Sequence, residues 1–275
     1  SASPSLANSA VTRKINVEAG GGWGTFALLG FLWGIPYLFL KVAVEEMSPS
    51  SIVFLRVLIG AIVLLPIALK RKTFYIARQY WPLLLLYTVT ELIGPWYLIT
   101  NAEQKITSGL TGLLVATVPI WAAILASIFG DHTVWHKSRL FGLIIGFIGV
   151  VAVVGIESLS GRQDMISIGM VLVAAMGYAY AINMVNRRIP QVPGLALNTW
   201  AMIITSFVYL PFAIISWPKE TPSIEAIGSV LGLGILCTAV AFILFFKLVA
   251  EVGPPRASLI TYLNTAVAVV LGVIL

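Results

Sequence analysis

The chain has 275 residues, of which 59% are hydrophobic and 10% are charged, and its mean hydropathy is +0.98. Ordinary soluble domains carry about 25% charged residues, so this composition excludes a soluble globular protein and a disordered one. The apolar runs are continuous and do not alternate, which excludes a membrane β-barrel. The net charge of +6 would favour nucleic-acid binding in a soluble chain, but here the basic residues follow membrane topology.

Nine stretches are apolar enough to cross a bilayer as helices, since about 20 such residues span its hydrocarbon core. The loops between them are short, and the polar residues 1–22 lack the apolar segment of a signal peptide. We therefore expect an all-α polytopic membrane protein. The nine stretches are 23–43, 49–69, 80–100, 106–128, 138–156, 166–187, 194–217, 224–248 and 253–275.

The basic residues gather on one side of the predicted membrane. Twelve fall in one set of alternate loops and four in the other, while Arg56 lies within a span. The positive-inside rule therefore places the N-terminus in the cytoplasm. The twelve are Arg13, Lys14, Lys70, Arg71, Lys72, Arg78, Lys137, Arg139, Arg187, Arg188, Lys247 and Arg256, and the four are Lys41, Lys105, Arg162 and Lys219.

The two halves of the chain resemble each other. FLWGIPYLF in the first half corresponds to AAMGYAYAI in the second and aligns Gly34 with Gly177, while LLPIAL and YLPFAI pair Pro66 with Pro211. If the first four spans correspond to the last four, the fifth span lacks a partner, and a tenth helix is expected beyond Leu275. Five helices per half is an odd number, so the second half is inverted, as in secondary transporters that bind substrate near the midplane.

Four segments carry a resemblance to a known family: WGIPYLFLK (33–41), SPSSIVFLRVLIGAIVLLP (48–66), RLFGLIIGFIGVVAVVG (139–155) and GPPRASLITYLNTAVAVVLG (253–272). With them the chain resembles the drug/metabolite transporter superfamily, specifically its EamA-type ten-helix exporters. The resemblance implies two inverted five-helix repeats around a central cavity. It also implies export of small metabolites, amino acids or drugs across a bacterial-type inner membrane.

The resemblance also sets the expected domains. Residues 1–22 form a cytoplasmic tail, 23–156 the first repeat with helices 1–5, and 166–275 the second repeat with helices 6–9, its tenth helix missing. One departure is Thr265, which stands where the family usually has proline in the ninth helix, although Pro119 is kept in the first repeat.

Two charged residues, Arg56 and Glu91, lie deep within predicted spans, far from their ends, where ionisable groups are costly and mark functional sites. Their expected depths differ by only about 3 Å at a rise of 1.5 Å per residue, which allows an ion pair. Such a pair fastens the second span to the third. Alternatively, Glu91 is a proton-coupling carboxylate or a cation-binding group.

Aromatic residues recur on the helix faces of both halves. Trp33, Tyr37 and Lys41 share one face of the first span, and Tyr180 and Asn183 share one face of the sixth. These rings either line a cavity that binds solutes by stacking and cation–π contact or simply pack helices together, while Lys41 is expected to extend to the interface. The candidate cavity residues are Trp33, Tyr37, Glu91, Trp96, Tyr180, Asn183, Tyr262 and Asn264.

Several other chemistries lack support in the sequence. His132 and His136 have no third ligand nearby, the lone Cys237 has no metal-ligand spacing, and no Walker motif occurs. We expect no cofactor and no enzyme, although a membrane-embedded lipid-modifying enzyme is a distant alternative.

The favoured hypothesis is a secondary exporter that works by alternating access, with proton coupling through Glu91. An uncoupled facilitator and a nucleotide-sugar carrier of the same superfamily are the alternatives. The expected partners are a small-molecule substrate, the lipid bilayer and protons, with no nucleic acid; a monomer and a homodimer both remain open.

Overall fold

The structure is a computed structural model that describes residues 23–130 and 164–252, together with single positions within 141–152 and 260–267. All regular elements in this part of the chain are helical. After a helix of residues 23–34, they are α2 (Pro36–Ala43), α3 (Pro49–Lys70), η1 (Arg78–Tyr80), α4 (Trp81–Thr88), η2 (Val89–Ile93), α5 (Gly94–Ala102), α6 (Ser108–Val115), α7 (Val118–Ile128), α9 (Met165–Arg188), α10 (Gly194–Ile215), α11 (Ile224–Gly234), η4 (Ile235–Val240) and α12 (Ala241–Val252).

Seven of the nine predicted spans are confirmed, because seven helices in the described ranges are long and apolar enough to cross a membrane. The predicted spans 138–156 and 253–275 fall largely outside the described residues. The seven are Trp23–Ala43, Pro49–Lys70, Arg78–Ala102, Ser108–Ile128, Met165–Arg188, Gly194–Ile215 and Ile224–Leu248.

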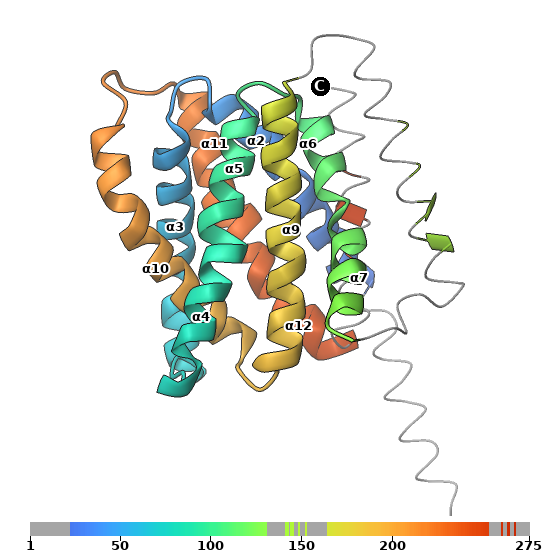
Figure 1. Cartoon of the computed structure of the whole chain (residues 1–275). Helices are drawn as coiled ribbons and strands as arrows, with labels where there is room; N and C mark the ends of the chain where they lie inside the picture. Colours follow the sequence, from blue (N-terminus) through green and yellow to red (C-terminus); the bar gives the residue numbers. More distant parts are fainter. Residues whose placement is uncertain are drawn as a thin grey trace, which may run out of the picture.

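The helices stand side by side, and the loops around residues 44–48, 103–107 and 216–223 lie together at one end of the bundle (top of Figure 1). The charge pattern predicts that this end faces outward, and we call it the predicted outer end. The opposite end, where α9 meets α10, is called the predicted inner end.

Polar residues at the predicted outer end set where four helices begin. Ser48 accepts a hydrogen bond from the Ser51 amide at the start of α3. Thr107, Asp164 and Ser223 accept equivalent bonds at the starts of α6, α9 and α11. These bonds satisfy amide groups that the first turn of a helix leaves unpaired.

The third and eighth spans share an unusual turn. The third contains the π-helical segment η2 and the eighth contains the π-helical segment η4, which begin at Val89 and Ile235. Pro95 follows η2 closely and has no amide proton to donate to the α-helical ladder, while the Gly94 amide donates to the Val89 carbonyl. The occurrence of the same turn in corresponding spans supports the internal repeat, and π-helical turns often lie at functional sites.

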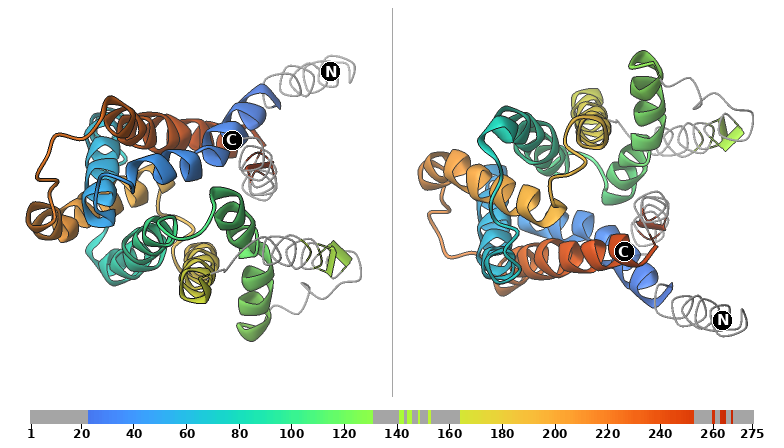
Figure 2. Two further views of the ribbon diagram at one scale, coloured as in Figure 1. Left: turned by 90° about the horizontal axis from the view of Figure 1, so that it is seen from above. Right: turned by 90° about the horizontal axis from the view of Figure 1, so that it is seen from below.

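The helices form two rows joined at one edge by α3 and α10, which pack along their length (Figure 2). One row, the α9 row, contains α4, η2, α5, α9, α6 and α7. The other, the α2 row, contains residues 23–34, α2, α11, η4 and α12. Each row therefore takes helices from both halves of the sequence, so the two repeats interlock.

Gly177 allows α9 to approach η2 closely. A Cβ atom there would lie 2.7 Å from the Thr90 carbonyl oxygen, a distance that real Cβ atoms do not show. Gly169 lies on the same helix, where a Cβ atom would meet nothing within 4 Å. The sequence repeat aligned Gly177 with Gly34, where a Cβ atom would likewise collide, 2.5 Å from the Val267 side chain.

We expect Gly177→Ala to destabilise the bundle by about 1–3 kcal/mol, because the added methyl group meets backbone that cannot yield. Thermal unfolding in detergent measures this effect. Gly169→Ala is the matched control and should leave the midpoint unchanged or raise it slightly, since alanine favours the helix. Equal midpoints for the two variants would contradict the close packing of α9 on η2.

Candidate functional site

A guanidinium group joins the two rows of helices. Arg56 on α3 donates from Nε to the Thr238 hydroxyl of η4 over 2.9 Å, and its Cζ lies 3.8 Å from the centre of the Trp96 ring of α5. Trp96 and Thr238 are both buried. A cation over a desolvated aromatic ring gains about 2 kcal/mol, which helps to offset the cost of charge at this depth.

The terminal nitrogens of Arg56 make no hydrogen bond to the part of the chain that the structure describes. A guanidinium presents its donors as a planar fork that matches a carboxylate. Because Nε and the ring face are occupied, the terminal nitrogens are the groups available for a ligand.

Glu91 lies on η2, and its Oε2 atom is buried without a hydrogen-bond partner among the described residues. The ion pair that its depth allowed with Arg56 is not formed: the ion pair found between described residues is Lys105–Asp164. A uniform helical rise predicts similar depths for the two groups, but it does not anticipate the π-helical turn, which redirects the side chains around it.

Tyr178 on α9 connects the charged groups. It interacts electrostatically with Glu91, Tyr37 and Arg56, and it lies next to Trp96. These five residues come from both halves of the sequence and form what we call the central cluster. Thr238 and the buried Cys237 complete it from η4.

The sequence analysis selected Tyr180 rather than Tyr178, and two residues rotate a helix position by about 200°. Tyr180 instead packs edge-on against Phe129, with ring centroids 6.4 Å apart. It lines a hollow of about 620 Å³ at the predicted inner end between α4, α7 and α9. Tyr180 therefore lines a hollow, as a cavity candidate would, but the residues that line this hollow do not include those of the other aromatic candidates.

Two other candidates serve in packing. Asn183 donates from Nδ2 to the Ala122 carbonyl over 3.1 Å and to the Ala179 carbonyl over 2.9 Å, which holds α9 to α7. Trp33 packs against Phe242 and Phe245, with ring centroids 5.8 and 5.1 Å apart. The packing interpretation, which the sequence left open, fits both residues.

Of the two cavity candidates in the ninth predicted span, Asn264 lies among the described residues and Tyr262 does not. Tyr262 and Thr265 lie outside the described residues, while Asn264 is helical and partly buried. The Asn264 carbonyl lies 2.9 Å from where a Cβ of Gly34 would be, so this span packs closely on the first.

Another polar contact that the sequence analysis did not anticipate joins the two halves. The Tyr87 hydroxyl of α4 donates to Asn198 Oδ1 of α10 over 3.0 Å, and both residues are buried. The signal for such contacts is a polar side chain within an apolar span, as at Thr238 and Asn198.

The described residues contain no group of three or more His, Cys, Asp or Glu that could hold a metal ion. His132 and His136 lie outside the described part of the chain.

The chain is similar to known transporter sequences over most of its length. The EamA-like transporter family matches residues 22–155 and 165–275. An uncharacterized inner membrane transporter of Escherichia coli, YedA, is 26% identical over 91% of this chain and 81% of its own length. An uncharacterized transporter of Bacillus subtilis, YoaV, is 25% identical over 83% of this chain and 79% of its own.

The fold also resembles a solved protein. One crystal structure matches with a TM-score of 0.66 at 20% identity, covering 91% of this chain and 88% of that protein. At this identity the likeness concerns the fold alone.

We expect Thr238→Val to destabilise the protein by about 1–3 kcal/mol, because it removes the acceptor of a hydrogen bond from a charged group. Thr238→Ser keeps the hydroxyl and should lose much less. Thermal unfolding of the two variants side by side measures the difference. If valine were tolerated as well as serine, the bond to Arg56 would not anchor the central cluster.

Proposed function

The chain belongs to the EamA-like transporter family and is a multi-pass membrane transporter, and on that premise we propose that it exports small metabolites, amino acids or drug-like compounds by alternating access. One observation carries the proposal: a fork-shaped cation, a carboxyl group and aromatic rings from both halves lie around Tyr178 in the central cluster. Secondary transporters place substrate sites at such an interface between repeats.

The two repeats are taken as residues 23–156 and 166–275, with the N-terminus in the cytoplasm of a bacterial-type inner membrane. The two separately matched ranges, 22–155 and 165–275, support the division. The distribution of twelve basic residues against four supports the orientation.

Among the substrate classes, a zwitterionic amino acid fits the central cluster best. Its carboxylate pairs with the terminal nitrogens of Arg56 and its ammonium with Glu91. The rings of Trp96 and Tyr178 accept an apolar or aromatic side chain. A buried single arginine is a poor match for the diphosphate of a nucleotide sugar, which carries more than one negative charge.

The structure is asymmetric in a way that supports alternating access. At the predicted outer end Lys41 of the α2 row donates to the Glu103 and Ile106 carbonyls of the α9 row. At the predicted inner end Arg187 of α9 instead donates to Phe129 and Ala126 within its own row. Polar contacts therefore tie the rows together at the outer end, and this arrangement is typical of an inward-facing state.

Glu91 is the proposed coupling group. Its buried oxygen has no partner among the described residues, so the carboxyl can take and release a proton without first breaking an ion pair. Burial favours the neutral form, and hydration on the open side favours the charged form. Exchange between the two states can thus couple proton movement to substrate movement.

We expect a pH gradient to drive the uptake of labelled amino acids into liposomes that contain the full-length protein. Glu91→Gln should abolish this stimulation, because an amide cannot carry the proton, and substrate exchange without a gradient should weaken as well, because the neutral amide no longer pairs with the substrate ammonium. Glu225→Gln, on the exposed first turn of α11, is the matched control and should retain stimulation. Uptake that ignores both the gradient and Glu91→Gln would contradict coupling and leave a facilitator.

A further inference from the structure

A second buried carboxyl lies at the predicted outer end. Glu103 directly follows α5, and its side chain is fully buried although its position between two spans suggests a loop exposed to water. Its Oε1 atom has no hydrogen-bond partner among the described residues. A carboxylate buried in this way is costly unless it is protonated or compensated.

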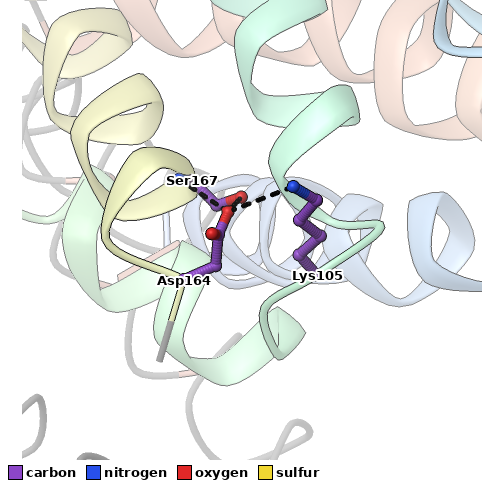
Figure 3. A network of polar contacts seen from close by, with 3 residues as sticks. All are labelled: Lys105, Asp164 and Ser167. Carbon is purple, nitrogen blue, oxygen red and sulfur yellow. Dashed lines mark hydrogen bonds and ion pairs between the residues drawn. The ribbon is translucent and has the colours of Figure 1, made fainter. Parts of the chain in front are cut away.

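The groups around Glu103 come from α2 and α6. On α2 they are the Lys41 ammonium and Tyr37, and on α6 they are the Ser108 and Thr111 hydroxyls. Lys105 of the same loop is directed to Asp164, whose carboxylate also accepts from Ser167 (Figure 3). The Lys105–Asp164 distance is 3.7 Å, so this pair fixes the loop to α9.

Lys41 belongs to the α2 row and holds the loop of the α9 row by binding the loop's backbone carbonyls. Its Nζ atom donates to the Glu103 carbonyl over 2.8 Å and to the Ile106 carbonyl over 3.1 Å. The ammonium therefore satisfies two carbonyl groups of the loop. Lys41 was expected to extend to the interface, and at this end of the bundle its half-buried ammonium binds the two loop carbonyls. Burial raises the pKa of Glu103 to about 8, and the Thr111 and Ser108 hydrogen bonds and the Lys41 charge lower it only in part.

The single hydroxyl proton of Ser108 links Glu103 to the α2 row. The Ser108 Oγ atom lies 3.1 Å from Glu103 Oε2 and 3.0 Å from the Tyr37 carbonyl oxygen of α2. A serine hydroxyl has one proton, so it cannot donate to both oxygens. A protonated Glu103 can donate to Ser108 Oγ, which leaves the serine proton for Tyr37. An ionised Glu103 instead accepts the hydrogen bond from the Ser108 hydroxyl, and the bond from α6 to α2 is lost.

We propose that Glu103 is a second proton-binding site, which holds the α2 and α9 rows together at the predicted outer end while protonated and lets them separate when it ionises. On ionisation the proton passes from the Glu103 carboxyl to water on that side, and no other covalent bond is made or broken. The inference rests on the proposed alternating access, because it concerns the opening of one end.

The direction of the pH dependence follows from the state in which water reaches the Glu103 carboxyl. In an open state the pKa of Glu103 returns toward about 4.3, whereas in the closed state it is about 8. The closed state is therefore fully favoured below the lower value and loses its advantage as pH rises toward the higher one. Between the two values its population relative to the open state falls by about tenfold per pH unit.

Cys237 provides a reporter for opening. It is the one cysteine of the sequence, it is fully buried, and it lies beside Arg56 in the central cluster. A membrane-impermeant thiol reagent added outside intact cells that express the full-length protein reaches this thiol only when the predicted outer end opens. The labelling rate is measured from pH 6 to pH 9 in the wild type and in Glu103→Gln.

We expect the wild-type rate, divided by the Glu103→Gln rate at the same pH, to rise about tenfold or more between pH 6 and pH 8. The division cancels the ionisation of the thiol itself, which both proteins share. Glutamine stays neutral and can donate to Ser108, so this variant remains closed. A ratio that does not change with pH would overturn the proposal, and so would a Cys237 that reacts in neither protein yet reacts after denaturation.

Ser108→Ala keeps the inference testable if Glu103→Gln folds poorly. It removes the hydroxyl that joins Glu103 to Tyr37, so labelling should be fast at low pH and lose its Glu103-dependent rise. Slow labelling at pH 6, as in the wild type, would contradict the proton relay. The two proposals fail in different ways. If labelling depends on Glu103 but no amino acid is transported, the proposed substrates are refuted and the Glu103 site stands. If transport is coupled through Glu91 but labelling lacks this pH dependence, the Glu103 site alone is refuted.

Discussion

The fold depends on compensating one positive charge inside an apolar bundle. Arg56 obtains that compensation from the Trp96 ring in one row and the Thr238 hydroxyl in the other, 3.8 and 2.9 Å away. A guanidinium placed on α3, which bridges the rows, therefore requires both rows to be present and correctly turned. The π-helical segment η4 supplies Thr238 to this contact.

The interlocking of the two repeats explains how movement of the rows affects both ends of the bundle. Each row contains helices of both halves, so a relative tilt of the rows changes contacts at the two ends in opposite directions. The outer contacts made by Lys41 and Ser108 are polar bonds that lie beside a buried apolar cluster shared by Leu40 of α2, Leu110 of α6 and Val171 of α9. Such bonds exchange readily with water, which suits a gate that opens repeatedly.

Much of the architecture follows from the sequence, and its limits have physical causes. Hydropathy places the ends of the seven described spans within about two residues, because the thickness of the bilayer determines how many apolar residues a span needs. Sequence alignment of the repeats pointed to Tyr180 and did not single out Tyr178 of the central cluster, because it does not record how a helix is rotated. Glu103 looked like a surface acid, since its burial arises only when α2 packs against α6.

The recognition of a carboxylate by Arg56 is the central claim, and paired binding measurements test it most directly. Calorimetry compares an aromatic amino acid with its methyl ester, in the wild type and in Arg56→Lys. The account predicts that the ester binds the wild type about tenfold or more weakly, whereas the variant distinguishes the two ligands far less, because lysine lacks the planar fork. Equal discrimination by both proteins would show that the carboxylate binds elsewhere and would contradict the assigned site.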